Sequence, residues 1–234
     1  AIISQYPTLW AQIVSDLQDA TQPYRPNDLD GRSENMLWQT LIGTWDEKGP
    51  ISSDRLRQYL VKAIREQKTW TTWTAPDETR EKELLDYVDQ IICDPQVAEI
   101  VSRWRSETRQ ATRYTIVANK ALQLTMPGVA DVYQGSEITQ TSLVDPDNRR
   151  PVDFNDLAQR LSLLDQEGLD HTADPSLDDL KLNLTAAILR LRRRRKECFV
   201  STTASYEALA LSTGYAVAFA RGTASEGPQI VTIA

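Results

Sequence analysis

Cysteine and histidine are scarce in this chain, which limits the chemistry that it can perform. The 234 residues include two cysteines, Cys93 and Cys198, and one histidine, His171. Cysteines this far apart can form a disulfide, but a reducing cytosol disfavours it, so we expect core residues or unreactive thiols. His171 lies in a polar Asp/Pro segment with no histidine or cysteine beside it, which argues against a zinc site. We therefore expect no metal.

Long apolar runs and an excess of positive charge are missing as well. No stretch approaches the ~18 apolar residues that a membrane-spanning helix needs. The formal net charge of −7 argues against general affinity for nucleic acid. The first ten residues, AIISQYPTLW, lack the basic-then-apolar plan of a signal peptide, so we expect a cytoplasmic protein. The hydrophobic content of 41% is enough for one large core or two modest ones.

Residues 8–125 have the apolar spacing of a series of helices. Leucine, isoleucine and valine recur three or four positions apart, which lines one face of each predicted helix. The predicted stripes are Leu9, Ile13, Val14 and Leu17; Leu37, Leu41, Ile42 and Trp45; Leu56, Leu60 and Ile64; and Leu84, Leu85, Val88, Ile91 and Ile92. Pro76 and Pro95 are expected in the first turns of two later helices, and Pro127 is expected to stop the last one.

Beyond residue 126 the pattern changes. The apolar run 129–133 has the length and bulk of a strand buried on both faces. Two helices are predicted around residues 156–166 and 176–196, and short apolar runs after Phe199 predict a β part that ends within a strand, as if truncated. The chain is thus predicted to be mainly α with a β part, in three regions: a helical subdomain (1–125), a strand, loop and helices (126–197), and the start of a β domain (198–234).

Six of the seven residues 190–196 are positive. A basic run of this kind can bind nucleic acid, but cations at the C-terminal end of a helix are favourable and mostly solvated. Because the run stands alone on an acidic chain and lacks interleaved aromatic residues, we expect no nucleic-acid partner.

A polar loop follows the predicted strand. Tyr133 is expected to be half core and half pocket wall, Gln134 leads out of the strand, and Glu137 either binds a ligand or anchors backbone amides. The loop itself carries Asp145, Asp147, Asn148, Arg149 and Arg150 between two prolines. Forked carboxylates and guanidiniums suit the hydroxyl pairs of a sugar. An ion-pair network that only holds the loop in shape is the alternative, and the pattern alone favours neither.

A second candidate surface lies in KTWTTW, residues 68–73. Trp73 offers a flat apolar face for a pyranose ring, and Lys68 can donate to the hydroxyls of that ring. Trp70 is better explained as a core residue at a helix end. Its spacing of three from Trp73 would also let the two rings form one aromatic platform on a helix.

These motifs resemble a known family. VADVYQGSE (129–137) resembles the eighth-strand motif of the alpha-amylase superfamily, glycoside hydrolase family 13. The longer strings PGVADVYQGSE and SLVDPDNRRPVDF are similar to one family within it, the maltooligosyl trehalose synthases. The seven residues 145–151 are highly specific, whereas YQG alone is weak. ENMLWQTLIGTW, KAIREQKTWTTW and RLRRRRKE extend the resemblance over nearly the whole chain, although Gln140 and Ala130 replace the family's usual aspartate and proline.

The resemblance implies the C-terminal part of an intramolecular transglycosylase, which converts the reducing-end α-1,4 linkage of maltooligosaccharides to an α,α-1,1 linkage. The implied fold is a helical subdomain, the last strand and helix of a (β/α)8 barrel, and the start of a β domain. The loop residues, Tyr133, Gln134, Glu137, Lys68 and Trp73 are the implied substrate contacts, and no cofactor is implied.

The family's nucleophile aspartate and acid/base glutamate are not among these residues. We therefore expect the chain to be inactive without the N-terminal barrel. Two alternatives remain: another amylase-family hydrolase or transferase, and a non-catalytic carbohydrate-binding module.

Overall fold

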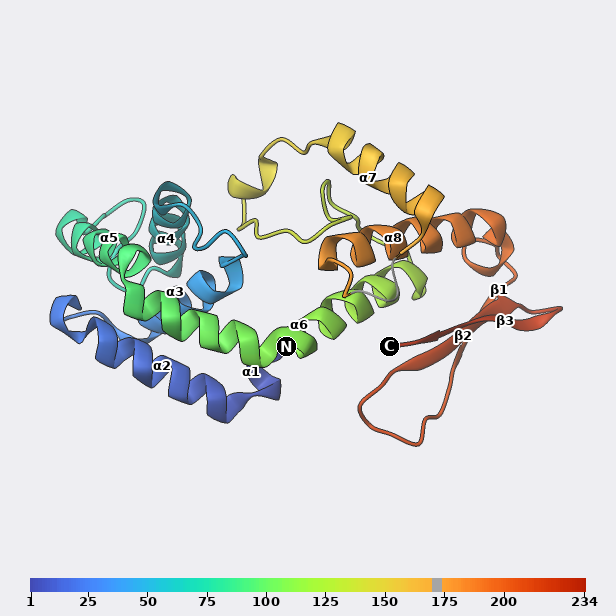
Figure 1. Ribbon diagram of the computed structural model, residues 1–234, viewed down its shortest axis with the longest axis horizontal. Coiled ribbons are helices and arrows are strands. Elements are labelled where there is room, and N and C mark those ends of the chain that lie inside the picture. The colour runs from blue at the N-terminus through green and yellow to red at the C-terminus, as the bar shows by residue number, and fades with distance from the viewer. Residues whose placement is uncertain (170–173) are drawn as a thin grey trace. The chain divides into compact units, whose positions relative to one another are not determined.

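The computed structural model describes residues 1–169 and 174–234 and divides them into two compact units (Figure 1). The first unit comprises residues 1–109 and 141–151, and the second comprises residues 110–140 and 152–234. Each unit thus contains segments that are distant in the chain. The division at residues 125 and 197 that the sequence suggests stays a prediction.

The first unit is built from helices around one apolar core. Its helices are α1 (Ile2–Gln5), α2 (Pro7–Thr21), η1 (Gln22–Tyr24), α3 (Gly31–Thr44), α4 (Ser53–Gln67), α5 (Glu78–Cys93), the first half of α6 (Pro95–Thr125), and η2 (Asp147–Arg149). The predicted stripes supply the core: Ile13, Leu17, Leu37, Leu41, Leu56, Leu60, Ile64, Leu84, Val88 and Ile91 are almost fully buried. Trp38 and Tyr87 join them at its centre. These helical predictions are confirmed.

The proline predictions differ in outcome. Pro95 begins α6, and Pro127 follows the end of that helix at Thr125, as expected. Pro76, however, lies outside α5, which begins at Glu78 after Asp77 caps it by accepting a hydrogen bond from the backbone N–H of Arg80. The carboxylate satisfies a free helical donor, which a proline ring cannot do, and the helix therefore begins directly after the aspartate.

The second unit combines helices with a small sheet. It contains the rest of α6, α7 (Phe154–Glu167), α8 (Leu177–Arg194), η3 (Lys196–Cys198), β1 (Ala204–Ala208), β2 (Ala218–Thr223) and β3 (Gly227–Ile233). The strands pair antiparallel in the order β1-β2-β3. Within β2, a Cβ on Gly222 would lie 1.9 Å from the carbonyl oxygen of Gly227, so only glycine fits this close pairing.

Residues 129–133, the predicted buried strand, have no strand structure in the described chain, and the barrel strand stays a prediction. The side chain of Val129 is 99% exposed. A strand exists only where a neighbouring backbone supplies its hydrogen bonds, and among the described residues none pairs with this run. The run is apolar, but its burial depends on partners that the described part of the chain does not supply.

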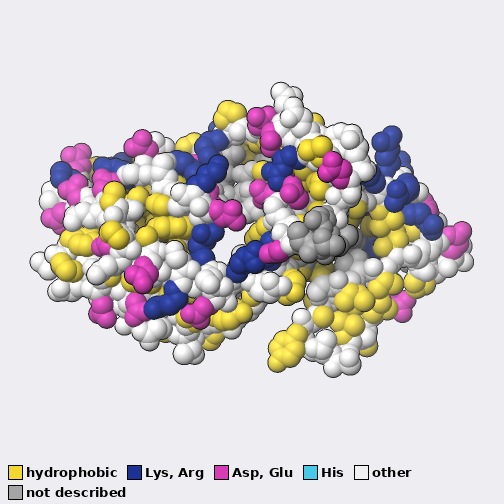
Figure 2. All heavy atoms as spheres, viewed as in Figure 1, with side chains coloured by type: hydrophobic (Ala, Val, Ile, Leu, Met, Phe, Trp, Pro, Cys, Tyr) yellow, Lys and Arg dark blue, Asp and Glu magenta, His cyan; other side chains and the backbone are white. Residues whose placement is uncertain are grey.

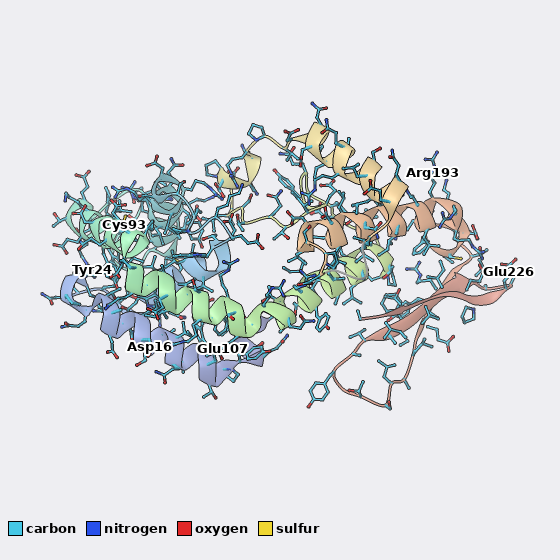
Figure 3. All side chains as sticks on the ribbon, viewed as in Figure 1. Asp16, Tyr24, Cys93, Glu107, Arg193 and Glu226 are labelled. Carbon is cyan, nitrogen blue, oxygen red and sulfur yellow. The ribbon has the colours of Figure 1, made fainter. Side chains whose placement is uncertain are left out.

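Three of the six positive residues in the basic run 190–196 make local contacts within the described structure. Figure 2 shows Lys and Arg side chains gathered near this end, and Figure 3 shows Arg193 pointing away from the ribbon. Arg190 pairs with Asp165 at 2.6 Å, Arg192 donates to the carbonyl of Leu124 at 2.7 Å, and Arg195 pairs with Glu197 at 2.9 Å. These contacts tie the helix end to its own unit.

The two cysteines form no disulfide in the described structure. Cys93, at the end of α5 (Figure 3), is an exposed free thiol, and Cys198 is a buried one. His171 lies outside the described residues. Within residues 1–169 and 174–234, no group of three or more His, Cys, Asp and Glu side chains is arranged to hold a metal ion. None of the helices described combines the length and apolarity needed to cross a membrane.

Candidate functional site

The polar loop 141–151 is held against α4 by two basic residues of that helix. Arg55 donates through Nε and Nη2 to the two carboxylate oxygens of Asp147, at 2.7 and 2.8 Å, and through Nη2 to the carbonyl of Thr141 at 3.0 Å. Two helical turns further along α4, Lys62 donates to the carbonyl of Asp145 at 2.6 Å. Leu143 packs against the core of the first unit. The loop is therefore fixed by its own backbone and by one carboxylate.

Asp147 is the anchor of the loop. Its side chain is only 10% exposed, and it also accepts a hydrogen bond from the backbone N–H of Leu143 at 2.7 Å. The hydrogen bonds from Arg55 lower the pKa of the Asp147 carboxyl, and the backbone bond from Leu143 adds to that effect. Both carboxylate oxygens are engaged by Arg55 of α4, and one also by the backbone of the loop. This geometry favours the role of an ion-pair network that holds the loop in shape over direct sugar binding by Asp147.

The loop arginines differ from Asp147 in exposure. The Arg149 side chain is 71% exposed and forms an ion pair with Asp145, four residues earlier. Arg150 is half exposed, and donates to the carbonyl of Asp147 at 3.1 Å and to Oγ of Ser142 at 3.2 Å. Both guanidiniums are accessible to solvent although each is also paired within the loop. Such groups can bind a hydroxyl pair with little loss of conformational entropy.

Asn148 lies in η2 between the anchor and the arginines. Its side-chain oxygen Oδ1 is buried, and no hydrogen-bond partner for it is found among the described residues. A buried acceptor of this kind calls for a partner, because desolvation without a hydrogen bond is costly. A ligand hydroxyl is one group that would supply it.

Lys68 and Trp73 lie just beyond α4. Lys68 ends the helix in the left-handed conformation, with φ 58°, and its backbone N–H bonds to the carbonyl of Ile64. Trp73 is 55% exposed, with the guanidinium of Arg65 5.1 Å from its ring centroid. Arg65 is in turn held by two hydrogen bonds to the buried Glu81, at 2.8 and 2.6 Å. Trp73 is thus an exposed ring on a supported loop.

The predicted aromatic platform of Trp70 and Trp73 is wrong in its geometry. It assumed a helix through both residues, but α4 ends at Gln67. Trp70 is partly buried and lies under the guanidinium of Arg80, 4.5 Å from the ring centroid, which supports a packing role for it. The left-handed residue Lys68 turns the chain away from the helix axis, so the spacing of three no longer aligns the rings.

Tyr133, Gln134 and Glu137 belong to the second unit. Tyr133 is half exposed and Gln134 is exposed, and a tight turn follows in which the N–H of Ser136 bonds to the carbonyl of Tyr133 at 3.1 Å. The turn requires Gly135, which has φ +77° and lacks the Cβ that would lie 2.5 Å from the side-chain nitrogen of Gln140. Gln140, the family-atypical residue, donates to the Gly135 carbonyl at 2.8 Å.

Glu137 lies near two lysines that the sequence analysis did not select. The charge of Glu137 acts on both Lys120 and Lys181, and burial lowers the pKa of each lysine. Lys120 donates to Gln123 at 2.7 Å and Lys181 to the carbonyl of Ile138 at 2.7 Å. Both line a cavity of about 1030 Å³ in the second unit, together with Ser136. Each lysine stands alone in its helical segment and belongs to no recognisable motif, so the sequence gives no signal for it.

Arg55 and Lys62 were also missed, for a related reason. Both belong to the polar face of α4, where the sequence indicates only solvated charge. The loop that they hold lies more than eighty residues downstream. Lys62 does fall within the family-like string KAIREQKTWTTW, which was the one available signal.

The chain is similar in sequence and in fold to known proteins. No family model matches the chain. A putative maltooligosyl trehalose synthase of Mycobacterium tuberculosis, found in strains CDC 1551 and H37Rv, is 36% identical over 227 residues. That alignment covers 94% of this chain and 27% of the relative. The chain therefore spans about a quarter of the length of the curated relatives that it matches.

Solved structures give the same result. A crystal structure of maltooligosyl trehalose synthase matches 94% of this chain and 30% of its own, with a TM-score of 0.78 and 25% identity. A hypothetical maltooligosyl trehalose synthase of Sulfolobus tokodaii has a TM-score of 0.77 with 31% identity, and the enzyme of Arthrobacter ramosus has 0.73 with 31%. In sequence and in fold, this chain is therefore a homologue of one part of the maltooligosyl trehalose synthases.

Proposed function

We propose that this chain is the C-terminal, substrate-binding part of a maltooligosyl trehalose synthase. The complete enzyme would convert the reducing-end α-1,4 linkage of a maltooligosaccharide to an α,α-1,1 linkage, in the cytoplasm and without a cofactor. The observation that carries the proposal is the loop 145–151. Arg55 and Lys62 anchor this loop, and its two arginines stay exposed. Its sequence resembles that of the maltooligosyl trehalose synthases, to which the chain is homologous.

The roles of the loop residues divide between holding and binding. Asp147 holds the loop through Arg55, whereas Arg149, Arg150 and the buried oxygen of Asn148 face the sugar. A charged hydrogen bond to a sugar hydroxyl contributes roughly 1.5–3 kcal/mol, provided that its guanidinium is already oriented. The ion pairs with Asp145 and Asp147 would supply that orientation.

The reaction would proceed by retaining double displacement, with the attacking aspartate and the acid/base glutamate supplied by the rest of the enzyme. The freed glucose would turn within the pocket, and its anomeric hydroxyl would attack the glycosyl-enzyme. Water must be kept out during that step, because it would hydrolyse the intermediate. Lys68 and the supported ring of Trp73 would form part of the wall that holds the glucose.

In the complete enzyme, residues 129–133 would become the eighth strand of a (β/α)8 barrel. No strand of the described residues pairs with this run, and the exposure of Val129 supports the assignment, since a large exposed apolar segment usually marks a surface that is covered by another part of the protein. Tyr133, Gln134 and Glu137 would then follow the strand at the carboxyl end of the barrel, where active sites of this fold lie.

The test is the product that the complete enzyme forms from maltopentaose. The proposal requires that reducing ends disappear while almost no free glucose is released, because the linkage is moved and no bond is hydrolysed overall. Release of glucose or maltose with an increase in reducing ends would instead indicate a hydrolase, because each hydrolysed bond creates a new reducing end. New, longer maltooligosaccharides would indicate an intermolecular transferase.

A further inference from the structure

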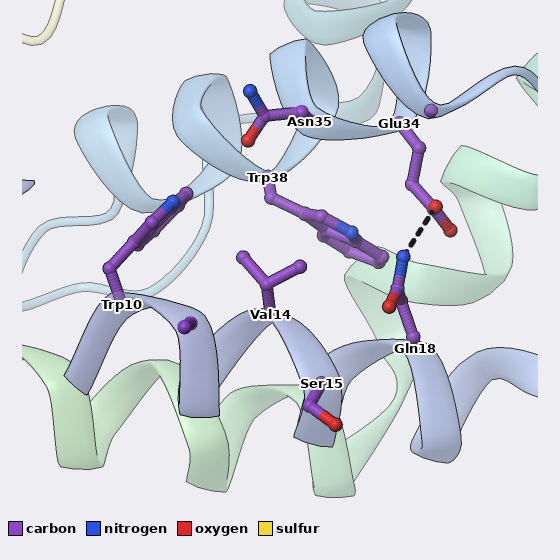
Figure 4. A pocket seen from close by; sticks show the side chains of 9 residues that line it. Trp10, Val14, Ser15, Gln18, Glu34, Asn35 and Trp38 are labelled. Atoms are coloured by element: carbon purple, nitrogen blue, oxygen red, sulfur yellow. Dashed lines mark hydrogen bonds between the residues drawn. The ribbon is translucent and has the colours of Figure 1, made fainter. Parts of the chain in front are cut away.

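A groove between α2 and α3 in the first unit has no role in the function proposed above. It has a volume of about 460 Å³ and is lined by residues of those two helices only (Figure 4). Trp10, Val14 and Trp38 form its apolar part, and Ser15, Gln18, Glu34 and Asn35 form its polar part. None of them belongs to the loop 141–151 or to residues 68–73. The volume is in the range of small-ligand sites.

The polar part of the groove is ordered and electrically balanced. Glu34 is only 2% exposed, and its carboxylate accepts hydrogen bonds from Nε2 of Gln18 at 2.7 Å and from Nε of Arg25 at 2.7 Å. Arg25 thereby neutralises the carboxylate, while Asn35 is exposed and adds an amide without charge. Such a lining offers both donors and acceptors, and favours a neutral ligand over an ion.

Trp38 supplies the most specific observation. Its side chain is 0% exposed, yet Nε1 has no hydrogen-bond partner among the described residues. Figure 4 shows this nitrogen on the side of the ring that lies toward Gln18, an exposed side chain whose rotation would give access to the indole N–H. Buried donors are nearly always paired, so a donor left over at the edge of a groove indicates an absent acceptor.

Trp10 provides a fixed apolar wall at the other end of the groove. Its ring packs edge-to-face on Trp104, with centroids 5.3 Å apart and an interplanar angle of 70°. An aromatic wall, neutral amides and a buried donor together suit a pyranose, which has an apolar ring face and a rim of hydroxyls.

We propose that the α2–α3 groove is a second binding site, specific for a neutral pyranose unit. The sugar ring lies against Trp10 and its hydroxyls meet Asn35 and the Glu34 carboxylate. With the Gln18 side chain rotated away, one hydroxyl oxygen accepts the hydrogen bond of Trp38 Nε1. The groove geometry alone selects a neutral sugar. The choice of an α-1,4-linked glucose chain as the ligand rests on the proposed function.

The experiment is a titration of the ¹⁵N-labelled chain with maltotriose, followed by NMR of the tryptophan indole N–H signals. The Trp38 signal should shift saturably at millimolar maltotriose. Asn35→Ala removes an exposed amide without touching the core, and should weaken binding by about tenfold, the loss of one good hydrogen bond. Trp10→Ala should weaken it at least as much, and Trp73→Ala should leave the Trp38 response unchanged.

The outcomes separate the two sites. A Trp38 signal that does not move, or a response that Asn35→Ala and Trp10→Ala both leave intact, overturns the groove proposal. A response of Trp73 alone also overturns it, while leaving the function proposed for the loop and Lys68 in place. A response of Trp38 that follows these variants supports the groove whether or not Trp73 responds.

Discussion

The guanidinium of Arg55 donates two hydrogen bonds, of 2.7 and 2.8 Å, to the carboxylate of Asp147, which lies 92 positions later in the chain. The same arginine also bonds to the carbonyl of Thr141. One residue of α4 thus closes the loop 141–151 at both its beginning and its centre. Bidentate pairing of this type is geometrically specific, because a planar guanidinium matches a carboxylate in one orientation.

Asp147→Asn should destabilise the first unit in a pH-dependent way. At about pH 7, we expect a loss of about 2 kcal/mol in the free energy of unfolding, since charged hydrogen bonds to Arg55 are weakened. The pKa of Asp147 is lowered in the folded state, so its ionised form favours folding. This contribution is complete above the unfolded pKa of about 4 and is lost as the pH falls through the folded pKa.

Urea denaturation of the wild type and the variant, at neutral pH and at about pH 3, measures this difference. It should shrink toward zero in acid. Asp86→Asn is the control, because its ion pair with Lys82 is exposed and worth little. A difference that stays constant over the pH range would mean that the ion pair is not the source of the stability.

Arg149→Ala and Arg150→Ala should each reduce turnover of maltooligosaccharides by the complete enzyme by more than about tenfold. Arg149→Ala should change the free energy of unfolding little, because both Arg149 and its partner Asp145 are well exposed. Arg150→Ala should lower it by about 1 kcal/mol, because Arg150 donates hydrogen bonds to Ser142 and Asp147. Initial rates and thermal unfolding are measured together, with the exposed Arg193→Ala on α8 as the control. Normal kinetics with reduced stability in both loop variants would make the network purely structural.

The chain of 234 residues alone should neither isomerise nor hydrolyse maltopentaose. Covalent catalysis needs an attacking group and an acid, and binding residues recover little of the rate without them. Chromatography of long incubations against a buffer blank checks this. Trehalose-type product from the pure chain would show that the catalytic groups lie within it.

Trp73→Ala in the complete enzyme should shift the products from the trehalose linkage toward free glucose. Removing the ring loosens the hold on the cleaved glucose, and water then reaches the glycosyl-enzyme first. The ratio of glucose to rearranged product is the decisive quantity, because a packing defect lowers both together. Lys68→Ala should act in the same direction but more weakly.

Lys68→Gly provides the matched control for this position. Both variants remove the ammonium, so the product ratio should change equally. Only glycine adopts the left-handed conformation at φ 58° without strain, so Lys68→Gly should be the more stable of the two by about 1 kcal/mol. A difference in product ratio between the variants would mean that backbone strain, and not the charge, affects the reaction. An unchanged ratio in all three variants would assign Lys68 and Trp73 to the framework.

Most helices of this protein could be predicted because their signals are local. The stripes around Leu17, Leu41 and Leu60 follow the helical repeat, and Ser176 caps α8 by accepting from the backbone N–H of Asp179, with acids in the first turn and arginines in the last. Each of these signals acts within four residues, so no knowledge of distant parts of the chain is needed.

The tertiary structure decided the features that depend on distant partners. Whether Asp147 holds the loop or faces a ligand is determined by Arg55, which the loop sequence does not contain. Among the described residues no strand pairs with the run 129–133, because a strand needs a neighbouring backbone. Trp70 and Trp73 do not share a helix face, because α4 ends before them and Lys68 turns the chain. The sequence by itself determined the helices, the composition of the loop and the family resemblance. Tertiary structure assigned the contacts, because hydrogen bonds and ion pairs join whichever residues the fold brings within about 3 Å.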